Sequence, residues 1–108
     1  MSTSRSAEQS SKSVFSSYAA EADLIDLIAT FVGTMPEKQR TMEALFRTGQ
    51  VDDLRTMAHQ LKGSGGGYGF GGLSQMALVL EQACKENDID RVGRALDELI
   101  GYMDRVHC

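Results

Sequence analysis

The sequence predicts an all-α protein: an antiparallel up-and-down four-helix bundle with an additional N-terminal helix. Apolar residues recur at helical spacing along most of the 108 residues. The chain has a single proline, and no stretch alternates apolar and polar residues as a half-buried strand does. Because short connections favour antiparallel neighbours, the predicted helices are expected to pack as a bundle.

Length and charge narrow the classes of function. A chain of 108 residues forms one domain with a modest core. Its formal net charge of -4 argues against nucleic acid as a partner, because phosphate binding needs a basic surface. No apolar run approaches the roughly 20 residues of a membrane span, and the N-terminus lacks the apolar core of a signal peptide. We therefore expect a cytoplasmic protein without membrane contact.

The N-terminal half contains the first two predicted helices. Residues 1–13 are rich in serine and too poor in apolar side chains to fold alone, so we predict a disordered tail there and a helical domain over 14–108. The first helix is expected over 18–33 and the second over 35–47, with Thr34 as its N-cap and Pro36 in its first turn. The apolar positions of these helices are Leu24, Ile25, Leu27, Ile28, Phe31, Val32, Met42, Leu45 and Phe46.

Three further helices follow. The third begins near Val51 and runs into a glycine-rich stretch, the fourth covers 71–86, and the fifth covers 89–106 with Asp88 as its N-cap. The apolar positions of the last two are Leu73, Met76, Ala77, Leu80, Cys84, Ile89, Val92, Leu96, Leu99, Ile100 and Met103. Cys84 is therefore interpreted as a packing residue, whereas His107 and Cys108 are expected to fray at the chain end.

The third helix contains the most informative residues of the chain. His59 and Lys62 precede a run, 63–72, in which seven of ten residues are glycine, although each helical glycine costs about 1 kcal/mol relative to alanine. A helical wheel at about 100° per residue places His59 about 140° from the centre of the apolar face, so its imidazole is predicted to be exposed. The apolar face consists of Val51, Leu54, Met57, Ala58, Leu61, Gly65 and Tyr68.

Two of the glycines extend the exposed face that carries His59. Gly63 lies one turn beyond His59 and Gly66 two turns beyond it, while Arg55 lies one turn before it. Glycine removes side chains and so allows another protein surface to approach closely. We therefore predict that Arg55, Gly63 and Gly66 belong to a docking surface. Gly65 is expected to pack inward, and the glycines of 69–72 are expected to form the turn.

The fourth helix supplies a partner for the imidazole. If the third and fourth helices form a hairpin centred on Phe70, His59 lies eleven residues before the turn and Glu81 eleven residues after it. A carboxylate that accepts the Nδ1 proton would fix the tautomer and leave Nε2 as the nucleophile. A solvated glutamate is the alternative. Leu78 lies on the same side as Glu81 and is predicted either to join the docking surface or to pack beneath the first helix.

These residues resemble a known family. The segment His59-Gln60-Leu61-Lys62-Gly63-Ser64, followed by small residues, Gly69, an apolar helix and Glu81, is similar to the histidine-containing phosphotransfer (Hpt) domain. The resemblance runs from about residue 21 to the C-terminus; the run of Gly65, Gly66 and Gly67 departs from it, because the family more often has alanine or serine there.

The resemblance implies a stand-alone bacterial phosphorelay protein. It implies that His59 accepts a phosphoryl group on Nε2 from a receiver-domain phosphoaspartate and passes it to another receiver. It implies that Lys62 stabilises the added charge, that Gly63 clears room for the receiver, and that Glu81 orients the imidazole. The expected partners are response-regulator receivers or a hybrid sensor histidine kinase, and Mg²⁺ would come from the receiver, since this chain is expected to need no cofactor or metal of its own.

Other interpretations are weaker. A phosphate-binding glycine loop would follow a strand and place its lysine after the glycines. A metal site built from His59, Cys84, His107 or Cys108 matches no zinc spacing. The remaining alternative is a helical adaptor that binds a receiver or sensor kinase without phosphotransfer. No kinase segment follows, so we expect a phosphoryl carrier without autokinase activity, and a monomer because no second long apolar face remains.

Overall fold

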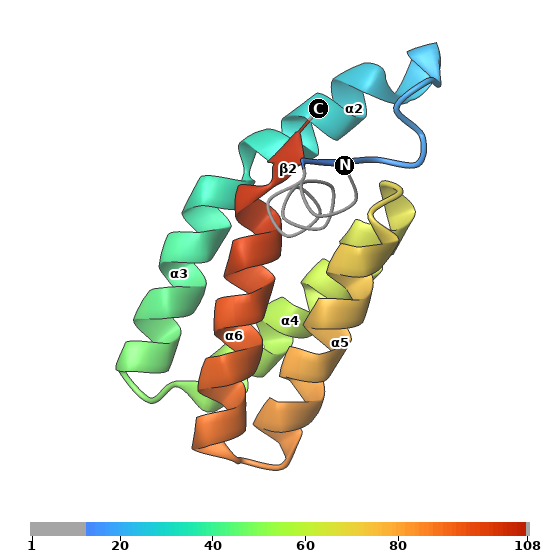
Figure 1. Cartoon of the computed structure of the whole chain (residues 1–108). Coiled ribbons are helices and arrows are strands. Elements are labelled where there is room, and N and C mark those ends of the chain that lie inside the picture. Colours follow the sequence, from blue (N-terminus) through green and yellow to red (C-terminus); the bar gives the residue numbers. More distant parts are fainter. Residues whose placement is uncertain (1–12, 108) are drawn as a thin grey trace, which may run out of the picture.

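The computed structural model describes residues 13–107, and these form a mostly helical domain (Figure 1). In chain order the elements are β1 (Val14–Phe15), the 3-10 helix η1 (Ala22–Leu24), α2 (Ile25–Gly33), α3 (Met35–Arg47), α4 (Val51–Gly67), α5 (Gly71–Lys85), α6 (Ile89–Asp104) and β2 (Val106–His107). The predicted tail lies outside the described residues except for Ser13, which is exposed.

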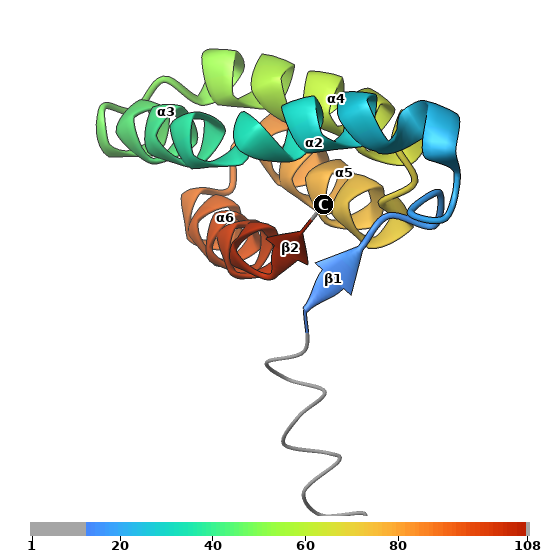
Figure 2. The ribbon, with the colours of Figure 1, turned by 90° about the horizontal axis from the view of Figure 1, so that it is seen from above.

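Four helices pack against each other around a common core. In a view along the bundle, α3 and α4 form one row and α5 and α6 form the other, and α2 lies across one end (Figure 2). Each of the four contacts two neighbours, because α3 touches α4 and α6 while α5 touches the same two helices. The predicted all-α bundle is therefore confirmed.

Most helix boundaries follow the local signals in the sequence. The second predicted helix matches α3 residue for residue, and Asp88 caps α6 by accepting a hydrogen bond from the Arg91 amide at 3.3 Å. Thr34 occupies the N-cap position of α3, but its hydroxyl donates to the carbonyl of Phe31 instead of capping. The fourth predicted helix, α5, begins at Gly71 as expected, so Gly69 lies in the turn but Gly71 and Gly72, which were also assigned to the turn, are helical.

The two ends of the domain correct the sequence-based prediction. The first helix was expected over 18–33, but 17–20 form turns and the regular helix begins at Ile25. The last helix ends at Asp104, and His107, expected to fray, pairs with Phe15 in a two-stranded parallel sheet. This pairing was missed because two-residue strands are too short to show alternation.

The N-terminal segment is hydrogen-bonded to the turn between α4 and α5. The buried Ser16 hydroxyl donates to the carbonyl of Tyr68, and the Ser17 amide donates to the carbonyl of Gly69 at 2.8 Å. Gly69 has a φ of +84° and its position is crowded by Ser16 and Tyr18, so a side chain would not fit there. The N-terminal strand thus closes the end of the bundle at the turn that follows α4.

The core contains the predicted apolar positions with three exceptions. Ile25, Leu27 and Ile89 are exposed although they were assigned to apolar stripes. Ile25 and Ile89 are the first residues of their helices, and Leu27 directly precedes the buried Ile28 of α2. The buried hydrophobic residues are Ile28, Phe31, Met35, Met42, Leu54, Ala58, Leu61, Phe70, Leu73, Ala77, Leu80, Ala83, Cys84, Val92, Ala95, Leu96, Leu99, Met103 and Val106.

Candidate functional site

The helix α4 presents His59 to solvent. Leu54, Ala58 and Leu61 are buried on the opposite side of the helix and anchor it to the core. The His59 side chain is 63% exposed, so the imidazole lies on the surface as the helical wheel predicts. An exposed histidine in the middle of a helix that is fixed on its other face has a defined position but remains accessible to a partner.

The α4–α5 hairpin has the register predicted from its turn. Gly66 lies four residues before Phe70, and Ser74 lies four residues after Phe70. A Cβ at Gly66 would lie 3.7 Å from the Ser74 hydroxyl. Further from the turn, His59 faces Glu81, and Nδ1 of the imidazole lies 2.9 Å from Oε2 of the carboxylate. The equal spacing therefore brings the two side chains together.

Glu81 is the buried member of the site. It is 5% exposed, and its two carboxylate oxygens have separate partners, since Oε2 contacts His59 and Oε1 accepts a hydrogen bond from Lys62 Nζ at 2.9 Å. The hydrogen bond from Lys62 is the largest influence on the pKa of Glu81 and lowers it, and the contact with His59 acts in the same direction against the effect of burial. Glu81 is therefore ionised near neutral pH.

The ionised carboxylate determines how the imidazole is protonated. An ionised carboxylate can only accept hydrogen bonds, so the contact at 2.9 Å requires Nδ1 of His59 to carry a proton. In the neutral ring, the lone pair available for reaction then belongs to Nε2. The geometry thus combines an exposed imidazole with a fixed tautomer.

Lys62 is positioned beside both groups. Its side chain is 32% exposed, and its ammonium group is bonded to Glu81. An ammonium has three hydrogen-bond donors, so the contact with Glu81 leaves two for another acceptor. The Lys62 carbonyl also accepts a hydrogen bond from the Ser74 hydroxyl at 2.8 Å, which ties this turn of α4 to α5. Ser74 was not singled out from the sequence, because the hairpin register places it level with Gly66 and not with Lys62.

The other predicted docking residues lie on α4 and α5. Gly63 and Gly66 are exposed, and a Cβ at Gly63 would meet no atom within 4 Å. Gly65 faces inward instead, where a Cβ would lie 3.2 Å from the Leu73 side chain. Leu78 is half-buried on α5 and, within residues 13–107, does not join the partly buried side chains packed on the core.

A hollow beside His59 is lined by two basic residues, Arg55 and Lys85, of which Lys85 was not predicted from the sequence. The hollow has a volume of about 480 Å³ and is lined by Asp52, Arg55, Thr56, His59, Glu81 and Lys85. Arg55 and Lys85 form no ion pair with any residue of the described part of the chain. Lys85 lies fifteen residues after Phe70 and Arg55 fifteen before it, so the register that located Glu81 could also have located Lys85.

Neither a metal-binding cluster nor a membrane-spanning helix is found in the described residues. Residues 13–107 contain no cluster of three or more histidine, cysteine, aspartate or glutamate side chains that could hold a metal ion. In the same range, no helix is long and apolar enough to cross a membrane. Cys84 is buried, and burial raises the pKa of its thiol.

The fold and the site together define a helical bundle that carries an exposed histidine whose tautomer is fixed by a buried carboxylate. Comparison with protein families gives the same result, because the sequence model of the Hpt domain matches residues 26–107, more than half of the chain. The chain belongs to the Hpt domain family. Searches of curated proteins and of solved structures found no match.

Family membership gives the general role. An Hpt domain has a phosphotransfer role in two-component signalling, and Hpt domains interact with receiver domains and kinases in phosphorelays. The matched range includes His59, Lys62 and Glu81.

Proposed function

We propose that His59 accepts a phosphoryl group from the phosphoaspartate of a receiver domain and passes it to the aspartate of another receiver. The observation that supports this most directly is the contact between His59 Nδ1 and the buried Glu81 carboxylate at 2.9 Å. This contact leaves Nε2 as the reactive nitrogen of a ring that is 63% exposed. Such a group can reach a phosphoryl donor only if a partner brings the donor to it.

The proposed transfer forms one bond to phosphorus and breaks another, and it requires only a nucleophile and charge stabilisation from this chain. The lone pair of Nε2 attacks phosphorus, a P–N bond forms, and the P–O bond to the receiver's aspartate breaks, which returns that carboxylate. The ring still carries its Nδ1 proton and becomes positively charged, and the Glu81 carboxylate stabilises this charge at hydrogen-bond distance. The reverse sequence of bonds delivers the group to the next receiver.

Lys62 supports the transferred group as it arrives. Phosphoryl transfer depends mainly on positioning and on stabilisation of charge spread over the phosphoryl oxygens. The two donors of Lys62 that Glu81 does not use can bond to those oxygens, and an ammonium on a flexible stem can adjust to them. In this proposal, Mg²⁺ is supplied by the acidic pocket of the receiver, where carboxylates suit that ion.

The receiver docks over the exposed face of α4 and α5. Gly63 and Gly66 leave this face without side chains, so the backbone of the receiver can come close to the imidazole. Arg55 borders the same face and contributes a positive charge next to an incoming phosphoryl group. Leu78 supplies apolar contact on α5 in this arrangement.

The test uses a receiver phosphorylated on its aspartate with a radioactive phosphoryl group. We expect the wild-type chain to acquire label that is stable in base and labile in acid, which distinguishes phosphohistidine from phosphoserine. His59→Gln should acquire none. His107→Gln is the matched control, because His107 is also exposed but lies in β2, and this variant should be labelled like the wild type.

The outcomes separate the carrier from the adaptor. If the wild-type chain binds receivers but no label moves to it from any of them, the protein is a non-catalytic adaptor and the proposal is wrong. If label appears in both His59→Gln and the wild type, another residue is the acceptor, which also contradicts the role of His59.

A further inference from the structure

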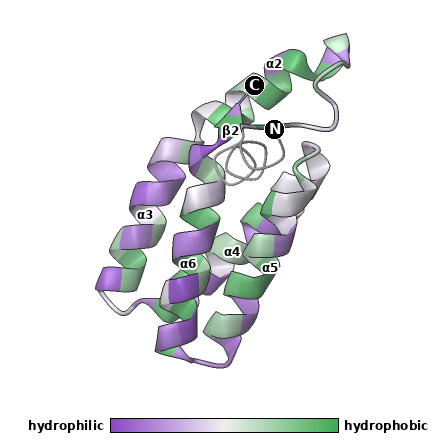
Figure 3. Cartoon of the chain, in the orientation of Figure 1, coloured by the Kyte–Doolittle hydropathy of each residue, from purple (hydrophilic) through white to green (hydrophobic). Residues whose placement is uncertain are grey.

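An exposed apolar surface lies at the end of the bundle, on elements other than the α4–α5 pair. Six large hydrophobic side chains are exposed within residues 13–107, and four of them, Phe15, Tyr18, Ile25 and Leu27, fall in a stretch of thirteen residues. Figure 3 shows hydrophobic colours along α2 in this region. Exposed apolar side chains indicate an interaction surface where they are contiguous, so those at a common hollow are the relevant ones.

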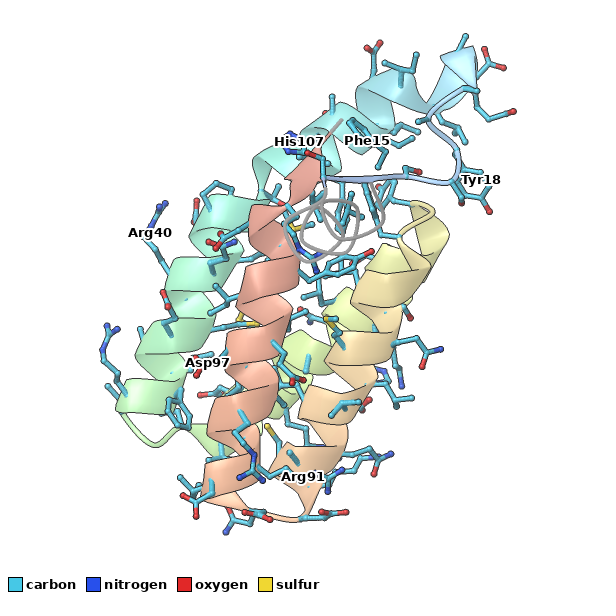
Figure 4. All side chains as sticks on the ribbon, viewed as in Figure 1. Phe15, Tyr18, Arg40, Arg91, Asp97 and His107 are labelled. Atoms are coloured by element: carbon cyan, nitrogen blue, oxygen red, sulfur yellow. The ribbon has the colours of Figure 1, made fainter. Side chains whose placement is uncertain are left out.

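Part of this surface surrounds a hollow, which we call the end hollow. It has a volume of 210 Å³ and is lined by Ser16, Ala19, Ile25, Ile28 and His107. Ile28 is buried and forms a floor, while Ile25 is 49% exposed. Phe15 extends the surface, because its ring lies against the ring of His107 with the centroids 5.7 Å apart (Figure 4). The hollow is smaller than the roughly 300–1,000 Å³ of a typical small-molecule pocket, so it suits a single side chain better than a small ligand.

Four of the five residues that line the end hollow come from a stretch of chain whose fixed charges are all acidic. Residues 13–37 contain Glu21, Asp23, Asp26 and Glu37 and no lysine or arginine. The other residues contain 11 acidic and 11 basic side chains, so the formal net charge of -4 comes wholly from this stretch. Glu21, Asp23 and Asp26 are all exposed, and they lie close in sequence to the lining residue Ile25. We call these three residues the acidic rim.

We propose that the end hollow binds a basic segment of another protein, with one bulky apolar side chain of that segment inserted between Phe15 and Ile25. An apolar anchor surrounded by complementary charge is the arrangement in which a buried side chain supplies affinity and the charged rim supplies selectivity. The acidic rim disfavours a second copy of this chain, because two copies of the same surface would bring like charges together. It disfavours an anionic membrane for the same reason.

This binding would be separate from phosphotransfer. The hollow is built from the N-terminal segment, α2 and β2, whereas His59, Lys62 and Glu81 lie on α4 and α5. A partner could therefore hold the protein by the end hollow while a receiver docks at His59.

The test is a titration of the ¹⁵N-labelled full chain with a lysine-rich peptide that carries one central phenylalanine, followed by NMR. We expect the amide shifts to change most in 15–28 and at His107. Replacing the phenylalanine of the peptide by alanine should weaken binding about tenfold. Replacing its lysines by glutamates should abolish binding, because the acidic rim then repels the peptide.

Two protein variants form a matched pair. Ile25→Lys should weaken binding of the phenylalanine peptide at least about tenfold, whereas Ile89→Lys should change it less than about twofold. Ile25 and Ile89 are 49% and 50% exposed, and each begins a helix, so the two substitutions perturb the fold similarly. Ile25→Ser and Ile89→Ser repeat the comparison without a change of charge. Label transfer to His59 should be unaffected in all four variants.

Several results would overturn the proposal. These are shifts centred elsewhere, equal binding of the acidic peptide, or equal effects of the Ile25 and Ile89 variants. A dimer in sedimentation that Ile25→Lys dissociates would show a second copy on this surface. Nuclear Overhauser contacts between residues 1–12 and Ile25 in the free chain would show that the chain's own N-terminal residues occupy the hollow.

Discussion

Gly63 and Gly65 are two residues apart on α4, but they face opposite environments. A Cβ at Gly63 would meet no atom within 4 Å, whereas a Cβ at Gly65 would lie 3.2 Å from the side chain of Leu73 and 3.3 Å from the Ser74 backbone. Gly65 is therefore required by the packing of α4 on α5. The packing leaves Gly63 free, so its lack of a side chain agrees with the proposed access of a receiver to His59. The direction of each glycine on α4 therefore separates the one that packing requires from the one that packing does not require.

Valine at position 65 should produce the largest change in stability. Gly65→Val places a branched side chain against Leu73, and overpacking of this kind costs about 1–3 kcal/mol. Gly63→Val is the matched control, because it introduces the same residue into the same helix at an open position. Chemical denaturation of both variants measures the difference. Equal stabilities would contradict the assignment of Gly65 to packing and Gly63 to access.

Glutamate at position 63 should weaken binding of the receiver and leave the fold intact. Gly63→Glu adds bulk and negative charge next to His59, where the proposed receiver brings a phosphoryl group and an acidic pocket, and we expect receiver affinity to fall about tenfold or more. Gly101→Glu is the control, since Gly101 is also exposed in open space within a helix. Calorimetric titration with the receiver checks this, and equal affinities for the two variants would exclude Gly63 from the docking surface.

Loss of the Lys62 ammonium should slow the reaction with little effect on helicity. Lys62→Ala removes the proposed charged hydrogen bond from Lys62 to the phosphoryl oxygens. Such a bond contributes about 1.5–3 kcal/mol when it is made in the transition state, so transfer should slow about tenfold or more. Lys85→Ala is the comparison, because Lys85 lines the hollow beside His59 and forms no ion pair within the described residues. Rapid-quench transfer rates test this. An unchanged rate in Lys62→Ala would mean that Lys62 only pairs with Glu81.

Acid should weaken the link between the two helices, and this is the smallest effect expected. The folded-state pKa of Glu81 lies below its ordinary value of 4.5, so its ionisation stabilises the fold above that pH. The stabilisation is lost as the pH falls below about 4.5 and through the folded pKa. Glu81→Gln lacks this titration, so the stability advantage of the wild type over Glu81→Gln should shrink with acidification. A constant difference in denaturation from pH 7 to pH 3 would contradict the prediction.

Helix positions, caps and the exposed faces of helices could be predicted, because they depend on residues that are close in the sequence. The second helix, the capping role of Asp88 and the exposed position of His59 all followed from periodicity and end signals. The contact between His59 and Glu81 also followed, since a hairpin with a short turn fixes which residues lie level. The exposure of Ile25 and Ile89 did not, because periodicity identifies a face and does not reveal where the core ends along the helix axis.

The sequence by itself determined the helices, the bundle and the presence of an accessible histidine, since these depend on helical periodicity and on glycine positions. Only the tertiary structure showed that Lys62 and His59 share the two oxygens of one buried carboxylate. Only the tertiary structure showed that Val14–Phe15 pairs with Val106–His107. This pairing brings His107 next to the N-terminal segment, where it lines the end hollow. Both features join residues distant in sequence, and their energies come from burial and charge in three dimensions, which a local pattern does not encode.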